Sequence, residues 1–229
     1  MTLILSSIAV SFEPKPMKRK CGHDIRPLVL RLLCIAILTM NIANQAHARI
    51  VKSLIEIRRE NVVVQQWDLS CGAAALTTLL NFQHHDMVTE KEVATMLMNR
   101  EEYIKNPLLV NIRQGFSLLD LKRYADGRGY EGIGYGKLTL DDLTKRAPII
   151  IPINLLGYNH FVVFRGMKGN RVLLADPAWG NRTLLVKQFE DAWISFPEVG
   201  KVGFVVARTD GTSVPNLLEP RADEFVMLQ

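Results

Sequence analysis

Cysteine is scarce in this sequence. Only three are present among 229 residues, and two of them, Cys21 and Cys34, lie within the first 48 residues. If that segment is removed, as argued below, Cys71 is the single thiol left and an internal disulfide is excluded. A lone thiol in an exported protein is exposed to oxidation, which favours a role as nucleophile. A buried cysteine acting as a small apolar residue explains the count equally well.

Long apolar runs are absent from the N-terminal segment as well. The apolar stretch Leu32–Ile42 is about half as long as the ~20 residues that a membrane-spanning helix needs. Basic residues precede it and the small-residue motif Ala46-His47-Ala48 ends it, which is the pattern of a secretory signal peptide. We expect residues 1–48 to be a cleaved signal peptide. An uncleaved signal that anchors the chain in the membrane is the alternative, and either Met1 or Met17 is the start.

A strong net charge is missing from the rest of the chain. The formal charge of +5 falls to +1 without residues 1–48, because that segment holds six basic and two acidic residues. The basic character therefore belongs mainly to the presequence and gives no reason to expect nucleic-acid binding.

Signatures of metal and nucleotide binding are also lacking. His84-His85-Asp86 has no second cluster at metal-ligand spacing, and both histidines are expected to face solvent after a helix. The glycines from Gly132 to Gly136 lack the spacing of a phosphate-binding loop. We expect no metal, no cofactor and no ATP.

The remaining chain reads as one α+β domain, residues 49–208, followed by a loose C-terminal tail, residues 209–229. Strand-like segments at Ser53–Ile57 and Val62–Gln65 come first. A helix follows from Cys71 to about Phe82, and three capping boxes predict further helices. These boxes are Thr89 with Glu92, Ser117 with Asp120, and Thr139 with Asp142.

The second half is rich in β-branched and aromatic residues and predicts a mostly antiparallel sheet. A short amphipathic segment, Val186–Ile194, crosses between the last two strands. The predicted strands are Ile149–Leu155, His160–Arg165, Arg171–Asp176, Thr183–Val186 and Val202–Arg208.

The turn near Lys168 pairs two of these strands as a hairpin. A hairpin centred there places His160 opposite Asp176, within reach of a hydrogen bond between imidazole and carboxylate. A slip of one residue would turn one of the two side chains to the other face. A structural histidine is the alternative for His160.

Cysteine nucleophiles need a base and a third group that orients the base. Cys71 at a helix N-terminus, His160 and Asp176 are candidates for these three roles. The helix N-terminus and a nearby imidazolium are expected to lower the pKa of the thiol. Gln65 or Gln66 can donate a side-chain amide to a developing oxyanion.

The segment from Gln65 to Leu76, with Asn159–Val163 and Ala175–Ala178, resembles the cysteine, histidine and aspartate boxes of C39 peptidases. The resemblance implies a papain-like fold with Cys71, His160 and Asp176 as catalytic triad. The family's spacing between glutamine and cysteine selects Gln65 for the oxyanion hole. The resemblance also implies a peptide or protein substrate with small residues beside the cut. Ser70 departs from the family pattern, which has an acidic residue there.

A stand-alone, exported member of this length is similar to the peptidases of functional-amyloid (Fap-type) secretion systems. That likeness implies a periplasmic enzyme whose partners are an amyloid subunit or its export machinery, with no stable membrane span after signal cleavage. Two other readings remain open: a papain-like module that binds a leader peptide or export partner without cutting it, and a cysteine acyl-transferase or amidase.

Overall fold

The computed structural model describes residues 30–31, 52–221 and 224–225. The predicted signal peptide and its cleavage site lie outside the described residues, apart from Leu30 and Arg31, which precede the apolar stretch. The helices are α2 Leu54–Arg59, α3 Cys71–Thr78, its continuation η1 Leu79–Gln83, α4 Glu90–Met98, α5 Glu101–Lys105, α6 Leu109–Ile112, α7 Leu118–Gly127, α8 Leu140–Arg146 and α9 Val186–Ala192. The strands are β1 Tyr130–Tyr135, β2 Ile149–Leu155, β3 Tyr158–Lys168, β4 Arg171–Asp176, β5 Gly180–Leu185, β6 Ser195–Phe196, β7 Gly200–Lys201 and β8 Gly203–Arg208.

All three predicted capping boxes form, and each begins a helix. Thr89, Ser117 and Thr139 accept hydrogen bonds from the backbone three residues on and open α4, α7 and α8. In each box the acidic side chain accepts the N–H of the cap residue in return, so two free donors of the first turn are satisfied. These helices are confirmed.

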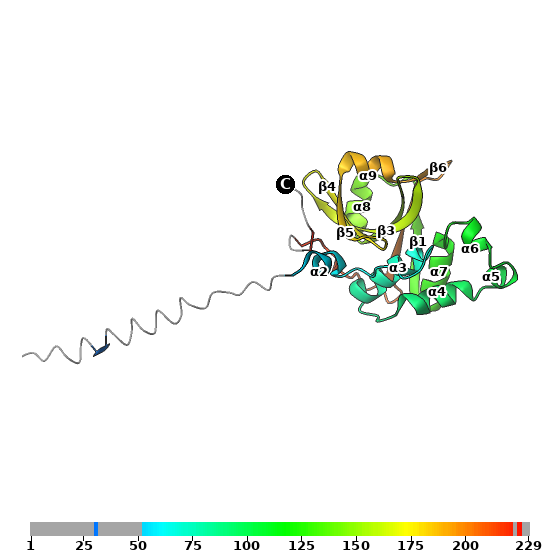
Figure 1. Ribbon diagram of the computed structural model, residues 1–229, viewed down its shortest axis with the longest axis horizontal. Coiled ribbons are helices and arrows are strands. Elements are labelled where there is room, and N and C mark those ends of the chain that lie inside the picture. Colours follow the sequence, from blue (N-terminus) through cyan, green and yellow to red (C-terminus); the bar gives the residue numbers. More distant parts are fainter. Residues whose placement is uncertain (1–29, 32–51, 222–223, 226–229) are drawn as a thin grey trace, which may run out of the picture. The chain divides into compact units, whose positions relative to one another are not determined.

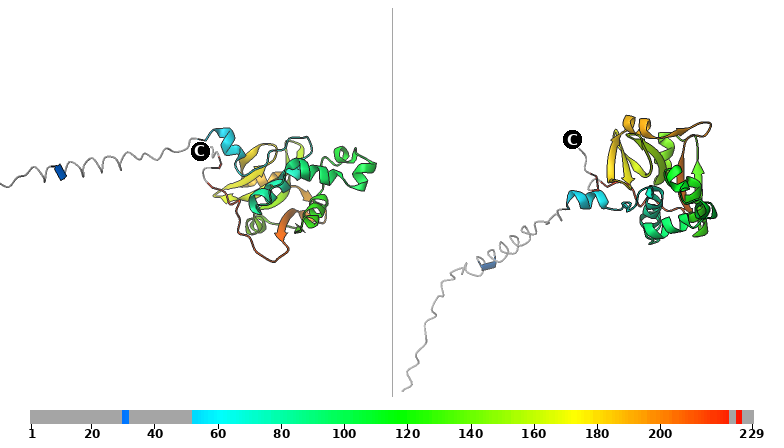
Figure 2. Two further views of the ribbon diagram at one scale, coloured as in Figure 1. Left: turned by 90° about the horizontal axis from the view of Figure 1, so that it is seen from below. Right: turned by 45° about the vertical axis from the view of Figure 1, so that its right-hand side comes forward.

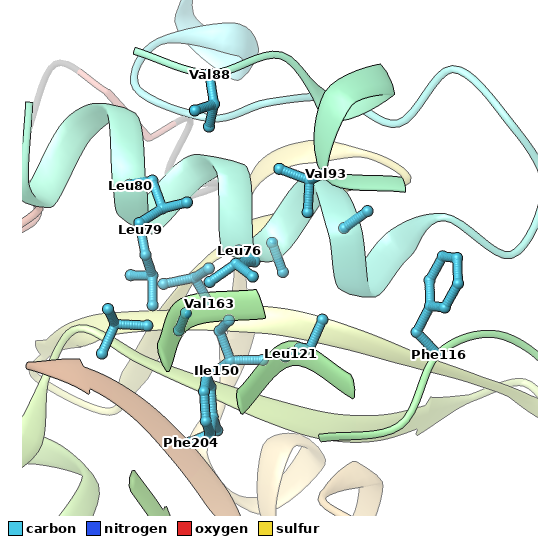
Figure 3. Close-up of a cluster of buried hydrophobic side chains, with 14 of the residues drawn as sticks. Leu76, Leu79, Leu80, Val88, Val93, Phe116, Leu121, Ile150, Val163 and Phe204 are labelled. Carbon is cyan, nitrogen blue, oxygen red and sulfur yellow. The ribbon is translucent and has the colours of Figure 1, made fainter. Parts of the chain in front are cut away.

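The helical half packs on one face of the sheet (Figures 1 and 2). Helix α3 is buried along its whole length, because its small residues let the backbone lie close to the strands. Figure 3 shows the apolar cluster that joins the two layers. It includes Leu76 from α3 and Leu79 from η1, Val93 and Leu121 from α4 and α7, and Ile150, Val163 and Phe204 from the sheet.

The main sheet has six strands in the order β1-β8-β2-β3-β4-β5, and all neighbouring pairs are antiparallel. A second apolar cluster covers its other face, where α8 and α9 contribute Leu143 and Phe189. The α+β class with helices packed on an antiparallel sheet is therefore confirmed.

The hairpin of β3 and β4 forms, but its register differs from the prediction. Lys168 faces Arg171, and a bulge between Phe164 and Gly166 shifts the pairing so that Val163 faces Ala175. Continued to the end of β4, this register puts Asp176 opposite Val162. Since side chains alternate between the faces of a strand, Asp176 and His160 share one face as a diagonal pair. The predicted direct opposition was wrong.

Two local predictions fail, and one strand was not predicted. The predicted strand at residues 53–57 is instead the N-cap and first turn of helix α2, because Ser53 and Glu56 make a capping box that outweighs the β-branched residues. Residues 62–65 form neither a helix nor a strand. No strand was predicted for the glycine-rich segment at 132–136, but most of it belongs to strand β1. A glycine is needed at position 132, because a Cβ there would lie 2.9 Å from the ring of Phe204.

The described part of the predicted tail is not loose. Leu218, Glu224 and Phe225 are buried, and Glu224 pairs with the fully buried Arg165 at 2.6 Å. The polarity of this segment suggested solvent exposure, but its polar groups satisfy buried groups of the domain.

His84 is a further correction. Its ring is buried, its Nε2 lies 3.1 Å from the carbonyl of Val206, and burial lowers its pKa. His85 is exposed as predicted.

Candidate active site

Cys71 is the first residue of α3 and is 3% exposed. The backbone N–H groups of Phe161 and Gly72 donate to its sulfur and favour the thiolate. Burial has the larger effect, with the result that the pKa of the Cys71 thiol is raised above its ordinary value. The expected lowering by the helix N-terminus is thus outweighed in the resting protein.

His160 and Asp176 are brought together at the end of the β3–β4 hairpin. His160 Nε2 lies 3.4 Å from Asp176 Oδ2, longer than a normal hydrogen bond, and both side chains are buried. Both ring nitrogens of His160 are buried, and neither has a hydrogen-bond partner within normal distance among the described residues. With the Nε2 proton directed at the carboxylate, Nδ1 is left as an acceptor.

Asp176 is completely buried and receives donors on both oxygens. Ala178 N–H donates to Oδ1 at 2.9 Å, and Arg182 lies 3.0 Å from Oδ2. Burial, the largest influence, raises the pKa of Asp176, but His160, Ala178 and Arg182 together hold it below its ordinary value. The carboxylate is therefore ionised at neutral pH and can stabilise a positive imidazole.

Gln65, rather than Gln66, faces the site. Its Nε2 donates to the Trp67 carbonyl at 3.0 Å, and its Oε1 is buried without a partner among the described residues. Its backbone N–H donates to the carbonyl of Pro177, the residue after Asp176, at 2.8 Å. Gln66 is exposed. The second amide proton of Gln65 is directed at the Tyr158 hydroxyl, so a substrate oxyanion would take the place of that hydroxyl as its acceptor.

The loop before Cys71 is held by a carboxylate that the sequence did not indicate. Glu90, buried at the start of α4, accepts the Gln66 N–H at 2.9 Å and lies 2.5 Å from the Ser70 hydroxyl. Leu69, between them, has φ +66°, a conformation that costs a residue with a Cβ. The acidic group absent at position 70 is thus supplied from another helix.

Two further residues border the site. Tyr158 lies two residues before His160 on the same face of β3, with ring centroids 5.3 Å apart, and its hydroxyl oxygen accepts from the Gln65 amide. Strand alternation could have indicated Tyr158. Arg182 comes from β5, and no sequence signal connects it with Asp176.

Cys71 and His160 line one cavity of about 330 Å³. Its walls combine the segment before α7 with the β6–β7 region, and apolar residues predominate on the strand side. The other lining residues are Arg113, Gln114, Phe116, Ser117, Leu118, Pro152, Asn159, Phe161, Ile194, Phe196 and Val202. This is room for a few small residues of an extended peptide.

A helix that presents a cysteine to a histidine and an aspartate on an antiparallel sheet defines a papain-like cysteine peptidase. The family model "Peptidase C39 family" matches residues 59–196. The chain belongs to the C39 family of cysteine peptidases, as the motifs predicted.

Two relatives carry the description "Probable functional amyloid protease FapD". That of Pseudomonas fluorescens is 37% identical over 146 residues, which are 62% of this chain and 61% of the relative. That of Pseudomonas aeruginosa is 31% identical over 188 residues, which are 77% of this chain and 81% of the relative. The chain thus spans less than two thirds of the first relative and most of the second.

Solved structures agree with the fold. A double glycine motif protease from an AMS/PCAT transporter, in complex with the leader peptide, is 27% identical with a TM-score of 0.50, covering 65% of this chain and 91% of that one. The peptidase domain of Streptococcus ComA has the same TM-score at 16% identity, covers 65% of this chain and 98% of that one, and is similar in fold alone.

Proposed function

We propose that this cysteine peptidase cuts an exported protein of a functional-amyloid secretion system, with Cys71 as nucleophile. The observation that carries the proposal is that Cys71 and His160 line one cavity, with Asp176 facing His160, in a chain 31–37% identical to probable functional amyloid proteases. His160 is the general base and acid, Asp176 orients it, and Gln65 with the Cys71 N–H forms the oxyanion hole.

The steps follow from the positions of these groups. As a peptide carbonyl enters the cavity, the Cys71 thiol passes its proton to Nδ1 of His160 and sulfur attacks the carbonyl carbon. The negative oxygen accepts from the Gln65 amide and the Cys71 N–H. The imidazolium, stabilised by Asp176, protonates the leaving amine. Water, deprotonated by His160, then hydrolyses the thioester and releases the carboxylic acid.

The raised pKa of Cys71 assigns a particular role to the substrate. The resting thiol is neutral, so proton transfer to His160 accompanies substrate binding instead of preceding it. Displacement of water from the cavity then strengthens the interaction between the imidazolium and Asp176.

The substrate class rests on the relatives. One related protease was solved with a leader peptide bound, and the Pseudomonas relatives are described as amyloid proteases. An amyloid subunit, its leader segment or a component of its export machinery is therefore the substrate we propose, cut beside small residues.

The location we propose is the periplasm, reached through the signal peptide of residues 1–48. Of the helices that the structure describes, none is long and apolar enough to cross a membrane. Amino-terminal sequencing of the protein from a periplasmic fraction should begin at Arg49. An intact N-terminus in the membrane fraction would favour the anchored alternative.

The cleavage test uses the purified full chain and synthetic peptides that span a co-exported amyloid subunit. We expect wild type to release two fragments with a new amino terminus, detected by mass spectrometry, and Cys71→Ala to release none. His85→Ala is the matched control, because His85 is exposed and outside the site. Bound but uncut peptide would instead establish the binding module, and a deamidated or cross-linked product the acyl-transferase.

A further inference from the structure

The bulge in β3 decides which face of the sheet Asp176 occupies. Near the turn, Gly166 faces Leu173. If that register continued unchanged, Asp176 would face Val163 and point away from His160. The extra residue of the bulge moves Asp176 opposite Val162 and so onto the face of His160. The catalytic pair therefore depends on one inserted residue about eleven positions before Asp176 in sequence.

The residue inserted at the bulge is Arg165, which is completely buried. Its contacts reach outside the β3–β4 hairpin, mainly to the C-terminal segment. Asn216 Nδ2 donates to its carbonyl at 2.9 Å. Its guanidinium donates to the Leu218 carbonyl at 2.7 Å, to Asn181 Oδ1 at 2.9 Å and to Glu224 Oε2 at 2.6 Å.

The C-terminal segment is fastened around this point. Glu224 Oε1 accepts from Asn61 Nδ2 at 2.7 Å, and the ring of Phe225 lies 5.2 Å from the Arg165 guanidinium carbon. A Cβ on Gly166 would lie 3.0 Å from Pro220, so the segment also contacts the bulge backbone closely. These C-terminal residues follow the stretch matched by the family model, residues 59–196.

These contacts favour the bulged register over the straight one. A bulge leaves a ladder position unpaired, and Asn216 satisfies the carbonyl that is left. A buried guanidinium requires an anion, and Glu224 provides it only where the bulge directs Arg165. In the straight register both groups would lose these partners.

We infer that Arg165 and Glu224 are positioning residues, through which the C-terminal segment fixes the bulge and keeps Asp176 on the face of His160. The inference rests on the proposed function for the roles of His160 and Asp176. It assigns to the C-terminal segment a part in catalysis that lies outside the matched family region.

The test compares Glu224→Gln with Glu219→Gln in the full chain. Glu219 lies in the same segment but is exposed. Nuclear magnetic resonance reads the register directly from cross-strand contacts between Val163 and Ala175. We expect Glu224→Gln to weaken or double these contacts and to lower kcat by about a hundredfold with little change in KM. Glu219→Gln should change neither.

A second variant covers the case in which Glu224→Gln does not fold. Asn216→Ala removes the donor to the Arg165 carbonyl and keeps the ion pair, and should reproduce both effects more weakly. An unchanged register in a folded variant, whether kcat falls or not, would overturn the inference. If wild type cleaves no peptide, the proposed function fails, while the register measurement still decides whether the C-terminal segment sets the bulge.

Discussion

Arg182 Nη1 lies 3.0 Å from Asp176 Oδ2, the same carboxylate oxygen that faces His160 Nε2 at 3.4 Å. An ionised carboxylate oxygen has two lone pairs, so Oδ2 can accept from both groups. Arg182 helps to keep Asp176 ionised and so connects β5 with the chemistry.

We therefore expect Arg182→Ala to shift the acid limb of the pH–rate profile to higher pH. The pKa of Asp176 is depressed in the folded state, so its stabilising ionised form is present above its ordinary pKa and is lost as pH falls through the folded value. Without Arg182 that loss begins at higher pH. A partly exposed ion pair contributes about 0.2–1 kcal/mol, so kcat/KM at neutral pH should fall less than about tenfold. Arg182→Lys, which retains the charge, should keep the wild-type limb; equal shifts in both variants would contradict the electrostatic explanation.

Alkylation of Cys71 should be slow at neutral pH in the resting protein. Burial raises the pKa of this thiol, so the rate should go on rising beyond about pH 8.5, the ordinary value for cysteine. Iodoacetamide labelling followed by peptide mapping separates Cys71 from Cys21 and Cys34. A rate that levels off below neutral pH and collapses in His160→Ala would show instead a preformed ion pair.

The same shift predicts how stability varies in alkaline solution. Because the folded pKa is raised, the neutral thiol stabilises the native state below the ordinary pKa, and this contribution is lost as pH rises through the folded value. Urea denaturation should show wild type losing stability in this range faster than Cys71→Ala. If the unfolding free energies of the two proteins fall in parallel as pH rises, the raised pKa of the Cys71 thiol is contradicted.

Glu90→Gln should destabilise the loop that carries Gln65 and Ser70. The substitution weakens two buried hydrogen bonds, and we expect a loss of about 1–3 kcal/mol in the free energy of unfolding with a lower kcat. Ser70→Asp alone should also destabilise, since it places a second carboxylate beside Glu90. Ser70→Asp combined with Glu90→Gln should recover part of the loss, because one acidic group is again present. If the losses in unfolding free energy of the two single variants simply add in the double variant, an acidic group at position 70 cannot replace Glu90.

Gly180→Ala should be more costly than an alanine at another left-handed glycine. Gly180 has φ +91° and pairs with Asp176, and a Cβ there would lie 2.3 Å from the Arg58 carbonyl oxygen. Gly169, with φ +56° and open space around it, is the control, for which we expect a loss of about 1–2 kcal/mol. At Gly180 the clash with the Arg58 carbonyl should add about 1–3 kcal/mol to the loss in unfolding free energy. Similar urea midpoints for the two variants would show that α2 moves aside freely.

The sequence predicted best the features encoded by neighbouring residues. Thr89, Ser117 and Thr139 each begin a helix through contacts three residues away, and β4 has the predicted bounds because Pro177 ends it. Ser53 makes the same contact with Glu56, but the isoleucines between and after them suggested a strand, and that local signal was misread.

Features that depend on distant partners could not be predicted in this way. The bulge at Arg165 is hydrogen-bonded by Asn216 and Glu224, which lie more than fifty residues later in the sequence. Glu90 reaches Ser70 from another helix, and Arg182 reaches Asp176 from another strand. His160 and Asp176 were paired from a hairpin centred at residue 168, whereas Lys168 faces Arg171 and the bulge then shifts the pairing by one residue. The two residues are therefore brought together diagonally and not by the predicted direct opposition.

The position of β8 has a consequence for the order in which the protein forms. This strand, residues 203–208, is the last of the sheet in sequence but lies between β1 and β2. During translation, Cys71, His160 and Asp176 are synthesised before β8, the strand that joins β1 to the rest of the sheet. The nascent chain therefore holds the chemical groups of a peptidase without the scaffold that unites them, and folding to the complete sheet must wait until nearly the whole chain has emerged.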